Sequence, residues 1–173
     1  MIMGINVRKY QESDISGMNR VWNEVVIEGI AFPQEETLNE KTGGDFFASQ
    51  SYTAVAVTEN GAVCGLYILH PNNVGRCGHI GNASYAVSSD MRGLHIGEKL
   101  VKDSLRMAKE LGFRLLQFNA VVESNIHARH LYERLGFQPL GMVPGGFRVK
   151  DGHFENIYLF YHTLSDGSRP DVF

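Results

Sequence analysis

The sequence predicts a mixed α/β (α+β) fold, in which helices pack on a single sheet. The predicted elements follow the order β-α-α-β-β-β-α-β-α-β-β, without an internal repeat or a low-complexity segment. A length of 173 residues suits one domain, and 43% hydrophobic with 20% charged residues is ordinary for a globular protein. We therefore expect one domain over residues 1–173, in which residues 165–173 form a loose C-terminal tail.

Charge and hydropathy argue against several classes of protein. A formal net charge of −3 does not suggest a general nucleic-acid-binding role. No apolar run approaches the roughly 20 residues that span a bilayer. Met1 to Tyr10 lack the apolar core and the cleavage site of a signal peptide. We therefore expect a cytoplasmic protein that has neither a membrane nor a nucleic acid as a partner.

The chain contains two cysteines, Cys64 and Cys77, whose positions do not match a metal-binding spacing. Without an export signal, two reduced thiols are favoured over a disulfide. We expect no bound metal.

The first part of the chain predicts one strand and two helices. Alternating apolar residues indicate a strand over Ile5–Tyr10. Ser13 or Asp14 can cap the next helix, which carries an apolar stripe and ends at Gly29. A weaker helix pattern runs from Glu35 to roughly Phe47.

Two strands joined by a tight turn follow. Thr53–Thr58 and Ala62–His70 are rich in β-branched and aromatic residues. Asn60-Gly61, between them, suits the two positive-φ positions of a type I′ turn. We therefore expect a β-hairpin closed by that turn.

A strand, a polar turn and a helix follow one another in the middle of the chain. The strand pattern covers Cys77–Val87 and includes Gly78 and Gly81, which mark a bulge or the close approach of a ligand. An amphipathic helix then runs over Gly97–Leu111, and Gly112 ends it. The first N–H groups of a helix lack internal partners, and the helix dipole adds positive charge there. We therefore expect a phosphate-bearing ligand at this helix start.

The last part of the chain predicts a strand, a helix and two further strands. Phe113–Val122 is nearly continuously apolar, as in a buried strand, and Asn125–Leu135 follows as a helix. The final strands cover Phe137–Val143 and Phe154–Thr163, and a glycine-rich loop over Pro144–Gly152 joins them.

Two motifs follow the fourth and fifth predicted strands. The first is Arg92-Gly93-Leu94-His95-Ile96-Gly97. The second is Ser124-Asn125-Ile126-His127-Ala128-Arg129-His130-Leu131-Tyr132-Glu133-Arg134-Leu135-Gly136-Phe137. Together with the element order, they resemble the GCN5-related N-acetyltransferase (GNAT) family from Ile5 to about Leu164. The resemblance implies a GNAT fold: a mixed, mostly antiparallel sheet of six to seven strands that splays between strands 4 and 5, with about four helices on both faces.

The resemblance implies an acetyl-CoA site. In the family, backbone N–H groups of the first motif wrap the pyrophosphate. Here His95 replaces the middle glycine, which is tolerable with a negative φ, because a positive φ strains a non-glycine residue. Asn125 would hydrogen-bond the pantetheine arm, and a backbone N–H near Val87 would stabilise the thioester oxygen where the strands splay apart. The implied cofactor-binding residues are Ala86, Val87, Arg92, Gly93, Leu94, His95, Ile96, Gly97, Asn125 and Ala128.

By the same resemblance, Tyr132 lies beside the thioester sulfur and acts as the general acid. A phenol has an unperturbed pKa of about 10, in the range of an alkyl thiol, so it can protonate the leaving sulfur. The position on the apolar stripe of the helix would by itself favour a core aromatic residue.

The general base stays open at this point. The family often uses a carboxylate on the fourth strand, and the run from Cys77 to Tyr85 contains none. His79 on that strand and Glu28 in the first helix–loop region are candidates, although each is more often a structural or surface residue. A weakly basic amine would need only water.

Two asparagines, Asn82 and Asn119, lie on the two strands that splay apart. A buried amide needs hydrogen-bond partners, so these side chains either tie the irregular sheet together or hold a polar group of the acceptor, such as a carboxylate. With Glu28 they form the candidate substrate-binding set. The run Arg76–Ala83 also resembles fungal acetyltransferases that act on proline-like cyclic amino acids such as azetidine-2-carboxylate.

These observations favour an acetyl-CoA-dependent N-acetyltransferase that acts on a small primary or secondary amine, with an amino acid or an analogue as the favoured acceptor. Two alternatives stay open, namely a protein or peptide N-acetyltransferase and a non-catalytic sensor that binds acyl-CoA. Many members of the family dimerise through their C-terminal strands, so the resemblance also admits a homodimer.

Overall fold

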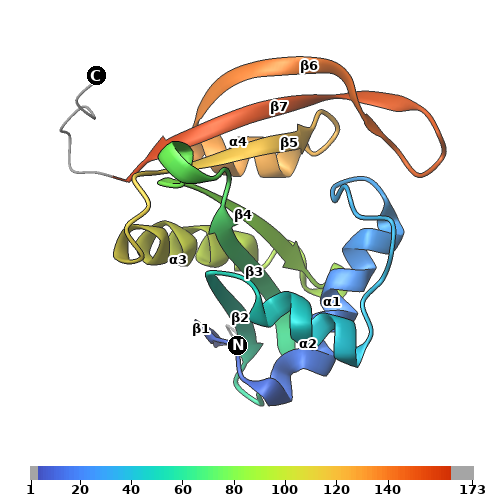
Figure 1. The fold of residues 1–173 in the computed structure, drawn as a ribbon. Helices are drawn as coiled ribbons and strands as arrows, with labels where there is room; N and C mark the ends of the chain where they lie inside the picture. Colours follow the sequence, from blue (N-terminus) through green and yellow to red (C-terminus); the bar gives the residue numbers. More distant parts are fainter. Residues whose placement is uncertain (1–3, 165–173) are drawn as a thin grey trace.

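A seven-stranded sheet in the order β1-β2-β3-β4-β5-β7-β6 forms the centre of the protein (Figure 1). The computed structural model describes residues 4–164, so the expected tail over residues 165–173 lies outside the described residues. Neighbouring strands are antiparallel except for the parallel pair β4 and β5. The elements are β1 (Ile5–Lys9), α1 (Ile15–Glu28), α2 (Glu40–Ala48), β2 (Tyr52–Thr58), β3 (Val63–Pro71), β4 (Ile80–Val87), α3 (Ile96–Glu110), β5 (Leu115–Val122), α4 (Ile126–Arg134), β6 (Gln138–Arg148) and β7 (Phe154–Thr163).

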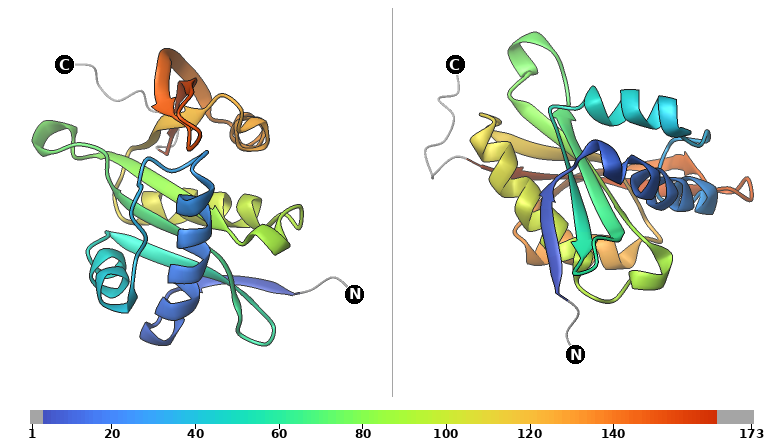
Figure 2. Two further views of the ribbon diagram at one scale, coloured as in Figure 1. Left: turned by 90° about the vertical axis from the view of Figure 1, so that its right-hand side faces the viewer. Right: turned by 90° about the horizontal axis from the view of Figure 1, so that it is seen from below.

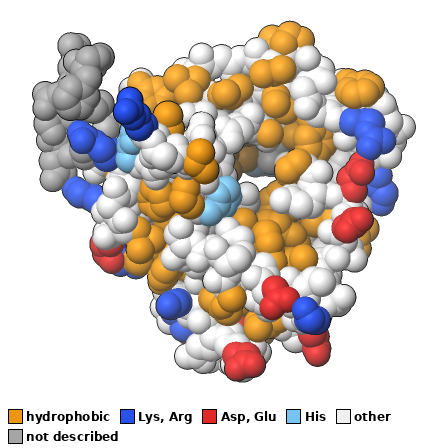
Figure 3. All heavy atoms as spheres, viewed as in Figure 1, with side chains coloured by type: hydrophobic (Ala, Val, Ile, Leu, Met, Phe, Trp, Pro, Cys, Tyr) orange, Lys and Arg blue, Asp and Glu red, His pale blue; other side chains and the backbone are white. Residues whose placement is uncertain are grey.

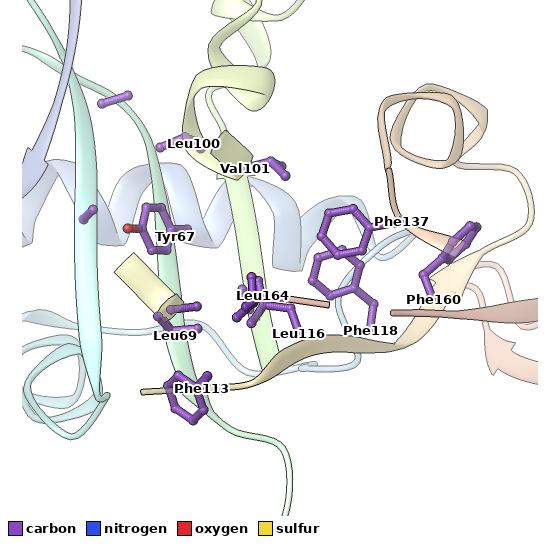
Figure 4. Packing of buried hydrophobic residues seen from close by; sticks show 14 of the residues in the cluster. Tyr67, Leu69, Leu100, Val101, Phe113, Leu116, Phe118, Phe137, Phe160 and Leu164 are labelled. Atoms are coloured by element: carbon purple, nitrogen blue, oxygen red, sulfur yellow. The ribbon is translucent and has the colours of Figure 1, made fainter. Parts of the chain in front are cut away.

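Helices cover both faces of the sheet, as expected (Figure 2). On one face, α1 and α2 bury a cluster around Trp22 and Phe47 against β2 and β3. On the other face, α3 and α4 pack on a second and larger cluster, which includes Tyr67, Leu100 and Phe118 (Figure 4). Burial of such side chains stabilises the fold by about 1.5–3 kcal/mol each. No helix within residues 4–164 is long and apolar enough to cross a membrane.

The sheet is divided between β4 and β5. Their register pairs are Ile80↔Leu115 and Gly81↔Leu116, after which the two strands separate. A Cβ atom on Gly81 would lie 2.9 Å from Leu116 Cδ2, so glycine here allows the close approach of another part of the protein rather than of a ligand. The separation therefore begins after Gly81, well before Val87, where the sequence analysis placed it.

Several predicted boundaries were wrong. The second helix begins at Glu40 rather than at Glu35, because the Asn39 side chain caps it by accepting a hydrogen bond from the Thr42 N–H at 2.9 Å. The fourth strand begins at Ile80 rather than at Cys77, because a short 3₁₀ turn over Gly75–Cys77 precedes it.

The turn between β2 and β3 also differs from the prediction. The hairpin is present, but among described non-glycine residues His95 alone has a positive φ, so Asn60 does not adopt the type I′ conformation. The Gly61 N–H donates to Thr58 O at 2.9 Å, and Gly61 has a φ of 83°. The Thr58 N–H donates to Ala62 O at 3.0 Å, so the loop between these two paired residues has three residues, 59–61, with glycine in the left-handed position after a tight turn.

The predicted glycine-rich loop over Pro144–Gly152 is mostly strand. β6 continues to Arg148, with an irregular register between Val143 and Phe147. Gly146 is required there because an added Cβ atom would lie 2.6 Å from Ile157 Cγ1. The hairpin of β6 and β7 consequently reaches over the loop that follows α1 (Figure 1).

Two smaller expectations concern single side chains. Cys64 is buried and Cys77 is exposed, and both are free thiols, as expected. Leu111, expected as the last residue of the third helix, lies just beyond its end at Glu110 and is 45% exposed.

Candidate functional site

A cavity of about 350 Å³ opens where β4 and β5 separate. Its wall includes Asn82, Asn119, Asn125 and Tyr132. These are four of the residues that the sequence analysis singled out. Asn82 lies on β4, Asn119 lies on β5, Asn125 is the N-cap of α4, and Tyr132 lies in the second half of α4. Figure 3 shows the hollow in this face of the molecule, with hydrophobic side chains around it and charged side chains mainly at the periphery. Residues distant in the sequence are thus brought to one site by the division of the sheet.

A larger cavity of about 670 Å³ lies beside the first, between the end of α1 and the hairpin of β6 and β7. The two cavities share Phe32, Pro33 and Gln34 as lining residues. An ion pair between Arg148 and Glu35, together with the hydrogen bond from Lys150 Nζ to Ile27 O at 2.8 Å, holds the hairpin against this segment. The segment after α1 therefore lies between the two neighbouring cavities and contributes to the walls of both.

The polar wall of the smaller cavity is a chain of amide side chains. Asn82 Nδ2 donates to the backbone oxygen of Gln117 at 2.9 Å and to Asn72 Oδ1 at 3.3 Å. Asn119 Nδ2 donates to the same Asn72 Oδ1 at 2.6 Å, and Asn119 Oδ1 accepts from Gln117 Nε2 at 3.0 Å. Asn82 therefore joins the separated strands through its side chain and also lines the cavity.

One backbone carbonyl determines the orientation of every amide in this chain. Gln117 O can only accept, so Asn82 must present Nδ2 to it, and the Asn72 atom beside that Nδ2 must be an acceptor. Asn119 must then present Nδ2 to Asn72. Two groups have no partner among the described residues, namely the Asn72 NH₂ group and Asn82 Oδ1. The wall therefore offers both donors and an acceptor to a bound molecule.

Tyr132 lies on the opposite side of the cavity wall, among aromatic rings. Its ring centroid is 4.6 Å from that of Phe118 and 6.3 Å from that of Tyr85. Desolvation by burial raises the pKa of Tyr132, so the phenol stays protonated well above neutral pH. Its hydroxyl makes no hydrogen bond with any residue in the described part of the chain, which leaves the proton available for transfer.

No carboxylate or cationic side chain within residues 4–164 lines the smaller cavity, and its titratable groups are His70, Tyr85 and Tyr132. The Tyr85 hydroxyl lies 2.7 Å from Ser104 Oγ. Burial raises the pKa of Tyr85 as well. The site is therefore a neutral, hydrogen-bonding pocket.

The second candidate region is the loop at the start of α3. Gly93 has a φ of 80° and His95 a φ of 58°, so His95 does not meet the condition of a negative φ under which the replacement of glycine is free of strain. His95 adopts the left-handed conformation that favours glycine, at a cost of roughly 1–2 kcal/mol. The His95 side chain is 78% exposed, and its Nδ1 lies 3.6 Å from Glu98 Oε2. The loop thus keeps a glycine-like backbone despite the replacement.

Side chains from one face of α1 hold the beginning of this loop. Glu24 Oε2 accepts the Ser89 N–H at 2.9 Å, and Arg20 Nη1 donates to Ser88 Oγ at 3.1 Å. Burial opposes ionisation of Glu24, but the hydrogen bonds from Ser89 and Ser88 and the nearby Arg20 outweigh it and lower the pKa of this carboxyl. The carboxylate therefore remains charged and bonded at neutral pH.

Glu28, one turn further along α1, pairs with Arg92 Nη2 at 2.7 Å. Glu28, which the sequence analysis included in the candidate substrate-binding set, is absent from the wall of both cavities. The physical reason for its position is that the Glu28 carboxylate is paired with the guanidinium group of Arg92, the first residue of the loop. His79 is exposed and also lies outside both cavities.

The other predicted cofactor-binding residues lie around the loop and the cavity. Ile96 and Ala86 are each 1% exposed and belong to the core, so they can meet a ligand only through the backbone. Val87 and Ala128 are half-buried, and Leu94 is 48% exposed. An added Cβ atom on Gly97 would lie 3.7 Å from Leu131 Cδ2. Asn125 Oδ1 caps α4 by accepting the Ala128 N–H at 3.4 Å.

His70 and Asn72 are among the cavity residues that the sequence analysis did not single out. Both lie where β3 ends and the loop to β4 begins, a position that the sequence alone does not connect with the fourth helix. The signal that could have found them is the hairpin register, since His70 is the direct partner of Asn82.

Comparisons with known proteins agree with this geometry. Residues 21–137 match the Acetyltransferase (GNAT) family. The N-acetyltransferase aca1 of Schizosaccharomyces pombe is 36% identical over 107 residues, which are 60% of this chain. The chain spans about half of that relative, 51% of its length.

Solved structures share the fold over nearly the whole chain. A GCN5-related N-acetyltransferase from Kribbella flavida is 29% identical, with a TM-score of 0.85 over 92% of this chain and 97% of that one. A phosphinothricin acetyltransferase from Sinorhizobium meliloti, in complex with acetyl-CoA, has a TM-score of 0.86 at 21% identity and covers 98% of each chain. The family match covers more than half of the sequence, so this chain belongs to the Acetyltransferase (GNAT) family.

Proposed function

We propose that the protein is an N-acetyltransferase that transfers the acetyl group of acetyl-CoA to the amine of a small molecule with a carboxylate, such as an amino acid or an analogue. The observation that carries the proposal is the neutral, amide-lined cavity beside Tyr132 at the separation of β4 and β5. Acetyl-CoA would supply the activated acetyl thioester.

The separated strands and the loop suit the two ends of acetyl-CoA. After Gly81 and Leu116, the facing edges of β4 and β5 are no longer paired with each other, so an extended amide-bearing arm can lie between them as an added strand. The backbone N–H groups from Arg92 to Gly97 would face the pyrophosphate at the start of α3. Asn125, whose Nδ2 makes no hydrogen bond within residues 4–164, would bind the arm near the thioester.

Tyr132 would act as the general acid. Its raised pKa keeps the phenol protonated at neutral pH, and the proton would pass to the sulfur as the carbon–sulfur bond breaks. A phenol whose pKa exceeds that of a thiol donates less readily in the ground state, so we expect transfer to accompany bond cleavage. A backbone N–H of β4 would stabilise the negative charge that develops on the carbonyl oxygen.

The chemistry of the cavity favours an amino-acid acceptor over a polycation. A polyamine, an aminoglycoside or a lysine-rich peptide carries several positive charges, which acidic side chains would recognise. No acidic side chain of residues 4–164 lines the smaller cavity. The Asn72 NH₂ group instead offers two donors with no partner in that part of the chain, which suits the two oxygens of a carboxylate.

A panel of amines tests the proposal directly. Purified protein is incubated with acetyl-CoA and with amino acids, proline analogues, polyamines, aminoglycosides or a histone-tail peptide, and the release of free thiol is followed. We expect turnover with amino acids or proline analogues. Turnover with the peptide alone would identify a protein acetyltransferase. Binding of acetyl-CoA without turnover of any amine would identify a sensor.

A further inference from the structure

We propose that His70 is the general base that removes a proton from the ammonium group of the acceptor. This assignment rests on the proposed acetyltransferase function. No carboxylate of the fourth strand is available for this role, and the two candidates suggested by the sequence, His79 and Glu28, lie outside the cavity.

His70 enters the cavity from the face of the sheet opposite to Tyr132. Its register partner on β4 is Asn82, and directly paired residues of antiparallel strands project to the same face. Ile68, two residues earlier on β3, packs in the cluster under α1 and α2, whereas Tyr132 packs against the cluster under α3. The acceptor and the thioester can therefore approach from different faces, with a base on one side and an acid on the other.

A hydrogen bond determines which nitrogen of His70 is basic. Nδ1 lies 2.9 Å from the backbone oxygen of Pro71. A carbonyl oxygen only accepts, so Nδ1 carries the hydrogen and the neutral ring exposes a lone pair on Nε2. Nε2 makes no hydrogen bond with any residue among 4–164, and the ring is only half-buried.

The groups around the cavity leave no other base. From β4 and α4 the titratable side chains are Tyr85 and Tyr132, whose pKa values burial raises, so both remain neutral donors. The part of β5 that lines the cavity, and the segment from Ala31 to Gln34, contribute no charged side chain to the wall. The amides of Asn72, Asn82 and Asn119 do not take up protons at any pH of interest.

The proton balance closes with these two residues. Nε2 of His70 takes one proton from the ammonium group, and the neutral amine nitrogen attacks the thioester carbon. A nitrogen–carbon bond forms, the carbon–sulfur bond breaks, and the thiolate takes the proton of Tyr132. The second proton of the attacking nitrogen returns to the Tyr132 phenolate through solvent, and the His70 proton leaves to solvent. The products are the acetylated amine and the free thiol, with both side chains back in their starting protonation states.

Substitution of His70 by alanine tests the role. We expect kcat to fall by about 100-fold, in the range that general-base catalysis supplies, while acetyl-CoA affinity stays within about twofold. In the wild type, kcat should rise with pH and then level off, because only the neutral ring can accept a proton. In H70A it should continue to rise at higher pH, and added imidazole should restore part of the rate.

His79→Ala is the matched control, because it removes an exposed imidazole outside both cavities. It should leave the rate and the pH profile unchanged. His70→Gln, with a side chain of similar size that cannot act as a base, should resemble H70A in rate and the wild type in melting temperature. If H70A is slow but retains the wild-type pH profile and ignores imidazole, the base assignment is wrong. If the wild type itself turns over no amine, the acetyltransferase proposal fails instead.

Discussion

The two ends of the proposed acetyl-CoA path are built from different kinds of side chain. At the loop before α3, the fixed contacts are ionic, with Glu28 on Arg92 and the Glu24 carboxylate on the Ser89 N–H. At the cavity, neutral amides and phenols form the wall. At the loop, solvent lowers the free-energy cost of charged side chains. In the cavity, from which water must be excluded for the reaction, oriented neutral groups provide the hydrogen bonds.

The largest expected effect comes from placing a charge in the neutral cavity. Asn72→Asp keeps Oδ1 as the acceptor for Asn82 and Asn119 but replaces the NH₂ group by a negative oxygen. We expect kcat/KM for carboxylate-bearing acceptors to fall by about 100-fold, because like charges in such a site repel by several kcal/mol. Thiol release with saturating acetyl-CoA measures this.

Asn73→Asp provides the control at the neighbouring position. Asn73 is exposed, and its Oδ1 accepts the Val74 N–H at 2.8 Å, a bond that aspartate retains. This variant should behave as the wild type. If N72D lowers kcat/KM equally for amines that lack a carboxylate, Asn72 maintains the structure of the cavity wall and does not recognise the acceptor carboxylate.

A smaller effect is expected from removing the acid without changing the shape of the cavity. Tyr132→Phe should lower turnover by at least about tenfold, because the phenol proton is lost while the ring contacts with Phe118 remain. Acetyl-CoA affinity, measured by calorimetry, should change little. Tyr161→Phe, on β7 and outside both cavities, should have no effect on turnover. An unchanged rate in Y132F would mean that another group protonates the sulfur.

The smallest effect concerns the loop end. His95→Gly should stabilise the protein by about 0.5–1 kcal/mol, since glycine accepts a φ of 58° without the Cβ strain but loses more entropy on folding. Urea unfolding monitored by circular dichroism measures the change. His95→Ala retains the Cβ atom and should give no such gain. Equal stabilisation by alanine would show that the side chain, rather than the backbone conformation, is responsible.

The arrangement of elements was largely predictable because it depends on local patterns and on two motifs. The stripe of α3 and the run from Asn125 to Phe137 carry enough periodicity and spacing to indicate a sheet with helices on both faces. The type of the turn at Asn60 could not be predicted. The dipeptide Asn-Gly suits a type I′ turn, but it also suits a longer connection in which glycine alone has a positive φ.

Site residues that belong to one local sequence motif could be predicted. Site residues that are brought together only by the pairing of distant segments could not. Asn125 and Tyr132, which belong to one motif, line the same cavity as Asn82 and Asn119 of the two separating strands. The pairing of Glu28 with Arg92 could not be predicted, because the two residues are 64 positions apart and a charged residue on a helix gives no sign of what it faces. His70 and Asn72 were missed for the same reason, since only the register of β3 with β4 brings them to the cavity.

The short pairing of β4 with β5 has a thermodynamic consequence. Beyond Gly81 and Leu116, the facing edges of β4 and β5 are not paired with each other, so an extended ligand can bind between them. A ligand that occupies this place binds the folded state alone, so occupancy and folding become linked equilibria. At a concentration one hundred times its Kd, such a ligand adds about 2.7 kcal/mol to the free energy of unfolding. If that ligand is acetyl-CoA, as proposed, its depletion would lower the free energy of unfolding of the protein along with its activity.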